Sequence, residues 1–87
     1  MNNKQIMGEI EEHINDIEDN KYMRLISSDI LSALDRELFS FLYSNIKRFG
    51  LSEKKLSKSR DEIFVLFNRE EQRLDIKVDI KNLKRGK

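Results

Sequence analysis

The sequence predicts a small α+β fold in which two main helices precede a C-terminal antiparallel β-hairpin. Apolar residues follow a helical period in the first half of the chain and strictly alternate with charged residues near its end. A length of 87 residues is enough for one small domain. We therefore expect one domain over residues 1–87, with residues 82–87 forming a flexible basic tail.

The first predicted helix covers about residues 4–19. Its apolar side chains recur at spacings of four, four and three residues, which places them on one helix face: Ile6, Ile10, Ile14 and Ile17. Asp16, Glu18 and Asp19 lie in its last turn, where the helix dipole disfavours anions. We expect these three acids to lie near a compensating basic segment.

The second predicted helix covers about residues 29–49. Ser27 or Ser28 is a suitable N-cap for its start. Gly50 fits the left-handed position that follows a helix end, and Leu51 fits the apolar contact beyond it. Ser52 is a suitable cap for a short third helix that ends near Leu56, and a loop is the alternative for this stretch. The stretch from residue 22 to 26 is too short to assign.

The hairpin is predicted from two apolar segments of different pattern. The first, about residues 62–68, is apolar on both faces and rich in β-branched and aromatic side chains, and Ser59–Glu62 before it has the form of a capping box. The second, about residues 73–81, alternates apolar with charged residues and indicates a half-buried strand. Its charged face also protects an edge strand against unwanted pairing.

The net charge of +1, from 17 basic and 16 acidic residues, conceals an uneven distribution. Residues 1–20 hold one lysine and six acids, for a net charge of −5, whereas residues 21–60 hold nine basic and four acidic side chains, for +5. Such asymmetry is typical of an interaction surface or of segments that neutralise each other within the fold.

Few residues in the sequence suit catalysis, a metal ion or a cofactor. The chain has no cysteine, three glycines and one histidine, so it lacks thiol ligands and any glycine-rich phosphate loop. His13 shares a helix face with Glu9 and Asp16, but a metal site needs a further ligand, and we expect His13 to pair with Glu9. We expect no enzyme, no metal, no cofactor and no small-molecule substrate.

The longest apolar run, Ile63 to Phe67, is too short for a membrane helix, and the N-terminus is polar and acidic. We therefore expect no membrane contact and a cytoplasmic location. A composition rich in Ile, Lys and Asn, with one alanine and no proline, is typical of AT-rich coding and suggests a phage or mobile element.

The second helix carries an unusually wide apolar arc. One side of about 120° is extended by Phe39, Tyr43 and Ile46 to a total of about 220°, interrupted by Asp35, whereas a one-sided surface helix needs only about 100°. This arc must be covered from two directions, either within the chain or by a second chain. Phe39, Tyr43 and Ile46 are therefore the candidate partner interface.

Two function classes remain open from the sequence. The first is a non-enzymatic protein-interaction module, a homodimer or an assembly subunit that acts as a small regulator or inhibitor of a larger protein. The alternative is a small DNA- or RNA-binding protein that contacts phosphates through its basic residues. The candidate phosphate contacts are Lys47, Arg48, Lys54, Lys55, Lys58, Arg60, Lys84 and Arg85.

Overall fold

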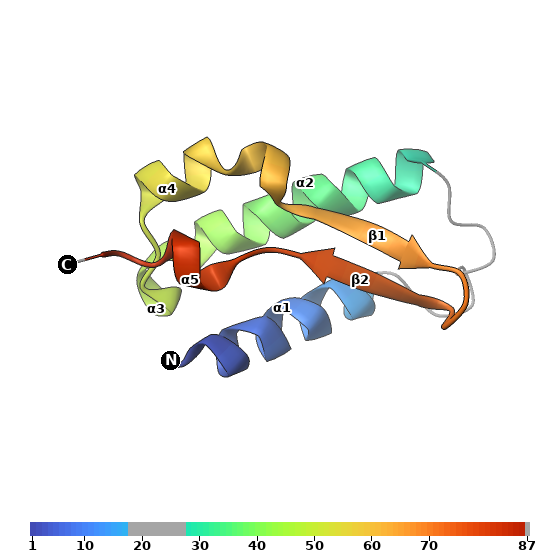
Figure 1. The fold of residues 1–87 in the computed structure, drawn as a ribbon, viewed down its shortest axis with the longest axis horizontal. Coiled ribbons are helices and arrows are strands. Elements are labelled where there is room, and N and C mark those ends of the chain that lie inside the picture. The colour runs from blue at the N-terminus through green and yellow to red at the C-terminus, as the bar shows by residue number, and fades with distance from the viewer. Residues whose placement is uncertain (18–27, 87) are drawn as a thin grey trace.

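The computed structural model describes residues 1–17 and 28–86 and has the predicted α+β order of helices followed by a C-terminal hairpin (Figure 1). Its elements are α1 (Asn3–Ile17), α2 (Ser28–Ser44), α3 (Ile46–Phe49), α4 (Glu53–Lys58), the 3-10 turn η2 (Arg60–Glu62), β1 (Phe64–Asn68), β2 (Arg73–Lys77) and α5 (Ile80–Leu83). The unassigned stretch 22–26, the predicted cap Ser27 and the predicted helix end at Asp19 lie outside the described residues.

Helix α1 forms because its isoleucines share one face. Ile6, Ile10 and Ile14 are fully buried, and Met7 is half-buried beside them. Gly8 lies on the opposite, exposed side, where nothing comes within 4 Å of the position that a Cβ would take. The predicted amphipathic helix is confirmed.

The predicted second helix is interrupted at Asn45, which separates α2 from α3. Asparagine side chains compete with the backbone for hydrogen bonds. Here Asn45 Nδ2 donates to the Phe41 carbonyl at 2.8 Å, and the Asn45 amide bonds to Leu42 three residues back. The 17-residue α2 therefore ends at Ser44, and one further turn follows.

The end of α3 has the predicted glycine cap. Gly50 has φ 67° and ψ 35°, the left-handed conformation that glycine adopts without steric penalty. The Gly50 amide donates to the Lys47 carbonyl at 3.2 Å, and the Leu51 amide donates to the Ile46 carbonyl at 2.9 Å. This pair of bonds is a Schellman motif, and its apolar contact is supplied by the fully buried Leu51.

Helix α4 begins after Ser52, whose hydroxyl accepts from the Lys55 amide at 3.2 Å, and it ends at Lys58, two residues beyond the predicted end. Its single buried residue is Leu56. The predicted capping box at Ser59 is wrong, because the Ser59 side chain makes no capping bond and a 3-10 turn follows instead.

Strands β1 and β2 form the predicted antiparallel hairpin, in the register that pairs Val65 with Ile76 and Leu66 with Asp75. The connection turns at residues 69–72: Asn68 Oδ1 accepts from the Glu71 amide at 3.1 Å, and Gln72 has φ 54°. Both strands are shorter than the predicted 62–68 and 73–81.

The alternating pattern overestimates the length of the second strand, because a short helix follows that strand directly. Asp79 accepts from the Asn82 amide and caps α5, so Ile80 and Leu83 become neighbours on a helix. Ile80 is 3% and Leu83 1% exposed. The Arg85 amide also donates to the Gly50 carbonyl at 3.0 Å. The packed structure thus extends into residues 82–85, which the sequence assigned to the tail.

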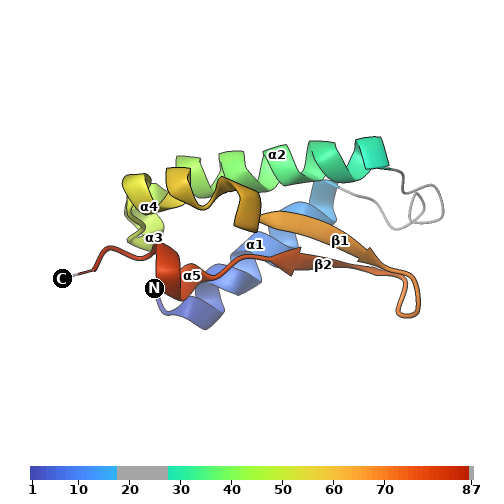
Figure 2. The same ribbon diagram turned by 45° about the horizontal axis from the view of Figure 1, so that its top comes forward.

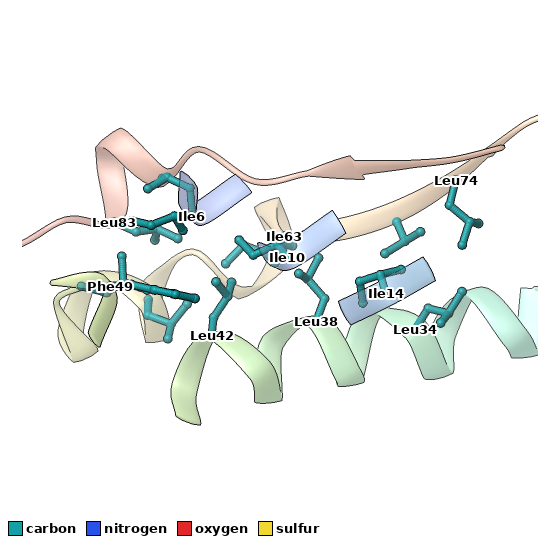
Figure 3. Close-up of a cluster of buried hydrophobic side chains, with 14 residues drawn as sticks. Ile6, Ile10, Ile14, Leu34, Leu38, Leu42, Phe49, Ile63, Leu74 and Leu83 are labelled. Carbon is teal, nitrogen blue, oxygen red and sulfur yellow. The ribbon is translucent and has the colours of Figure 1, made fainter. Parts of the chain in front are cut away.

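The core lies between α1, α2 and the hairpin. In Figure 1, β1 lies on the side of α2 and β2 on the side of α1. Leu34, Leu38 and Leu42 point from α2 toward α1 and the hairpin (Figure 3). These leucines are at most 2% exposed, so one face of α2 is fully covered by the rest of the chain.

Candidate functional site

The predicted interface residues lie on the outer side of α2 and in α3. Tyr43 is 39% exposed, Phe39 is half-buried, and Ile46 is half-buried in α3. The rings of Phe39 and Tyr43 lie 5.5 Å apart at a tilt of 49°. Phe39 and Ile46 also pack against the core of the same chain.

Helix α4 and the turn η2 cover part of this side. Tyr43 Oη lies 3.1 Å from Ser57 Oγ, and the Arg60 guanidinium lies 4.8 Å from the centroid of the Phe39 ring. A cation over an exposed aromatic ring contributes about 0.5–1 kcal/mol. The wide apolar arc is therefore covered in part within the chain, and Tyr43 remains its most accessible member.

A groove separates α2 from η2 and the start of β1. It has a volume of about 360 Å³ and is lined by the aromatic rings of Phe39 and Phe64. Charged side chains from both sides share this lining: Asp35, Arg36, Arg60 and Asp61. The lining of the groove thus combines two aromatic residues with charged residues of both signs. We name it the α2–β1 groove.

The outward face of β1 continues this apolar surface. Val65 points into the core and is 2% exposed, whereas its neighbour Leu66, which points the other way, is 45% exposed. Phe64, two residues from Leu66, shares the outward face. Within residues 1–17 and 28–86, only Tyr43, Leu66 and Met1 are large apolar side chains with this degree of exposure.

Sequence reasoning did not select Phe64 and Leu66, although the signal was present. A strand that is apolar on both faces is normally covered on both faces. Among the described residues, only one face of β1 packs into the core, and on the second apolar face Leu66 is accessible. The candidate interface therefore consists of Phe39, Tyr43, Phe64 and Leu66, around the α2–β1 groove.

The candidate phosphate contacts come from four parts of the chain. Lys47 and Arg48 belong to α3, Lys54, Lys55 and Lys58 to α4, Arg60 to η2, and Lys84 and Arg85 follow α5. Helix α3, α4 and the C-terminal segment lie toward the same end of the molecule (Figures 1 and 2). Lys55 Nζ donates to the Lys84 carbonyl at 3.1 Å, so the structure joins α4 to that segment.

Two of these cations contact other side chains, and three donate to backbone carbonyls: Lys55 to Lys84, Lys84 to Met1 and Arg85 to Leu51. The Arg48 guanidinium pairs with the Glu9 carboxylate of α1, and Arg60 lies over the Phe39 ring. An acid of α1 does pair with one of the candidate cations, as expected, but this acid is Glu9 rather than Asp16. The other two acids of the expectation, Glu18 and Asp19, lie outside the described residues.

His13 has a structural environment different from the predicted pairing with Glu9. Its ring stacks on Phe41 with centroids 4.0 Å apart, and Nε2 lies 3.1 Å from Glu37 Oε1. The pairing prediction is wrong because α2 brings Glu37 to the histidine while Arg48 takes Glu9. In the described residues, no group of three or more metal-binding side chains converges.

Comparison of the chain with protein-family models, with curated proteins and with solved structures found no match. Among the helices of residues 1–17 and 28–86, none combines the length and the apolar character needed to cross a membrane. A function must therefore be argued from the geometry of this chain.

Proposed function

We propose that the protein is a non-enzymatic interaction module that binds a larger partner protein through the α2–β1 groove and regulates or inhibits it in the cytoplasm. The observation that most directly supports this proposal is that Leu66 is 45% exposed on the outward face of β1, the strand that begins at the groove. Burying a leucine side chain stabilises a complex by about 2 kcal/mol, so an accessible one at a groove is a natural anchor.

The composition of this surface supports a protein partner. Protein interfaces are enriched in aromatic residues and arginine, with charged groups at the rim. Phe39, Tyr43 and Phe64 supply the aromatic rings, and Arg36 and Arg60 are among the residues that line the groove. The partner segment we infer presents an apolar side chain that contacts Leu66 and enters the groove.

A binding experiment with matched variants tests this proposal. The tagged protein is used to capture its partner from cells that express it, and the captured partner is then titrated against each variant. Leu66→Ala should weaken binding by about tenfold, and Leu66→Glu should abolish it, because a carboxylate would be buried without a partner. Gln5→Glu, which adds the same charge at an exposed position of α1, should bind like the original chain. Equal affinity of all variants would exclude this surface.

A second candidate function, nucleic-acid binding, is supported by the basic residues of α4 and of the segment after α5. We infer from the Lys55–Lys84 contact that lysines of α4 and the segment after α5 form one cationic surface able to contact phosphates. Of the eight candidate residues, Arg48 and Arg60 are already engaged with Glu9 and Phe39, and the side chains of Lys55, Lys84 and Arg85 donate to backbone carbonyls. This engagement, together with a net charge of only +1, favours the protein partner.

The two functions are separated by the salt dependence of nucleic-acid binding. A gel-shift titration at 50 and 200 mM salt, with mixed DNA and RNA probes, should show weak and unselective binding if the groove is the functional site. Micromolar binding at 200 mM salt would favour the alternative if substitution of Lys54, Lys55 and Lys58 by glutamine removed it. Each lost phosphate contact should lower the salt slope by nearly one unit.

A further inference from the structure

Among the described residues, 1–17 and 28–86, the outer edge of β2 has no neighbouring strand. Strand β2 pairs with β1 on one side. Within residues 1–17 and 28–86, no hydrogen bond from another element reaches the backbone of Leu74 or Ile76. An unpaired strand edge presents a row of donors and acceptors that can pair with another strand.

The register shows which groups point outward. Val65 donates its amide to Asp35 Oδ1 of α2, so this amide points away from β2. Val65 lies opposite Ile76, and in such an antiparallel pair both residues direct their backbone groups away from each other. The N–H and C=O groups of Ile76, and of Leu74 two residues before it, therefore face the open edge.

Space is available beside this edge. A groove of about 470 Å³ runs between β2 and α1, with residues 73–77 on one side and Glu11 and Asn15 on the other. Strand β2 lies on the α1 side of the hairpin in Figure 1. The opposite edge, that of β1, faces α2 and has its Val65 amide occupied, so the two edges are not equivalent.

We propose that a second copy of this chain pairs with β2 along this edge, antiparallel and with Ile76 on the two-fold axis. Ile76 then faces the partner's Ile76, and both direct backbone groups into the new ladder. Asp75 faces the partner's Lys77, and Lys77 faces the partner's Asp75. The two hairpins become one four-stranded antiparallel sheet.

Charge complementarity selects this register over its neighbours. Centring the pair on Asp75 would place two aspartates opposite each other and Arg73 opposite Lys77, which is destabilising. Centring it on Leu74 would need extended backbone at Gln72, which has φ 54° and belongs to the turn. The alternation of charges thus disfavours the register centred on Asp75 and favours the register centred on Ile76.

The state of the charged groups agrees with this arrangement. Lys77 is exposed and makes no ion pair within the part of the chain that the structure describes. Asp75 is contacted on its own strand by Arg73, with Nε 3.1 Å from Oδ1, and its side chain is still 31% exposed. The dimer would supply Lys77 with a partner and give Asp75 a second cation.

A charge exchange tests the proposal. Sedimentation equilibrium of the whole chain should show a reversible monomer–dimer equilibrium. Asp75→Lys alone and Lys77→Glu alone should each weaken the dimer by about tenfold or more, because each places like charges opposite each other twice. The double variant should restore the dimer, and an equal mixture of the two single variants should form the heterodimer. A matched Lys81→Glu change should have no effect.

Hydrogen exchange of the original chain gives a readout that needs no variant. The Ile76 and Leu74 amides should become protected as protein concentration rises, whereas the Val65 amide, already bonded to Asp35, should not change. A chain that stays monomeric at millimolar concentration would overturn the proposal. A dimer that ignores the charge exchange and leaves the Ile76 amide unprotected would also overturn it.

Discussion

Asp35 of α2 accepts a hydrogen bond from the backbone amide of Val65 in β1, with Oδ1 2.7 Å from the nitrogen. In the sequence, Asp35 is the one acid that interrupts the apolar arc of the second helix. In the structure it satisfies a strand-edge amide of a residue that is 2% exposed. This contact fixes β1 against α2 and therefore positions both walls of the α2–β1 groove.

Asp35→Ala should lower the free energy of unfolding by about 1–3 kcal/mol, because a poorly solvated amide would lose its acceptor. Asp35→Asn should cost less, since its side-chain oxygen still accepts although without charge assistance. Urea denaturation of the two variants measures the difference. Equal stability of the alanine variant and the original chain would contradict the structural role of this contact.

Substitution of two glycines by alanine should change the stability of the protein in opposite directions. Gly50→Ala should destabilise the protein by about 1 kcal/mol, because φ 67° is unfavourable for a residue with a Cβ even though the space around it is open. Gly8→Ala should stabilise it by up to about 1 kcal/mol through helix propensity, since nothing obstructs the added methyl group. Thermal melting of both variants should give shifts of opposite direction. Two shifts of the same sign would contradict the assigned conformations.

Leu83 tests whether the end of the chain belongs to the core. Leu83→Ala should lower the unfolding free energy by about 2–5 kcal/mol, because the side chain is 1% exposed and its loss leaves a cavity. The same change at the 45% exposed Leu66 should have a much smaller effect on stability. A negligible effect at Leu83 would restore the view of residues 82–87 as a tail.

The Glu9–Arg48 pair should contribute modestly and in a salt-dependent manner. Glu9→Gln should lower stability by at most about 1 kcal/mol at low ionic strength, and the difference should shrink in 0.5 M salt. Asp16→Asn is the control, because Asp16 lies near the end of the same helix and forms no ion pair within the described residues. A larger effect at Asp16 than at Glu9 would support the original expectation from the helix dipole.

Periodicity and capping predicted the elements with local signatures. The isoleucine face of α1, the glycine cap at residue 50 and the alternation in β2 each depend on residues close together in the sequence, and each is present. Asn45 and Asp79 are also local signals, of a helix break and of a helix start. Each of them lies within a longer periodic pattern that indicates the opposite. The helical period continued across Asn45 and the alternation continued to Ile80, so both elements were predicted too long.

The contacts between elements were harder to predict. Glu9 was expected to pair with His13 because they are four residues apart on one helix, yet α3 brings Arg48 to Glu9 and α2 brings Glu37 to His13. The exposed face of β1 was also not predicted. A strand that is apolar on both faces indicates that both faces need to be covered, but it does not indicate which face the chain itself covers. The candidate interface therefore shifted from Phe39, Tyr43 and Ile46, on α2 and α3, to Phe39, Tyr43, Phe64 and Leu66, on α2 and β1.

Site-specific photo-crosslinking from position 66 tests the central claim most directly. A photoreactive residue replaces Leu66 in one protein and the exposed Lys4 of α1 in a second, and both are illuminated in cells that express the native partner. We expect a discrete protein adduct from position 66 that resists nuclease and is absent from position 4. No protein adduct at position 66, together with nucleic-acid adducts from a photoreactive residue at Lys54, would contradict the account.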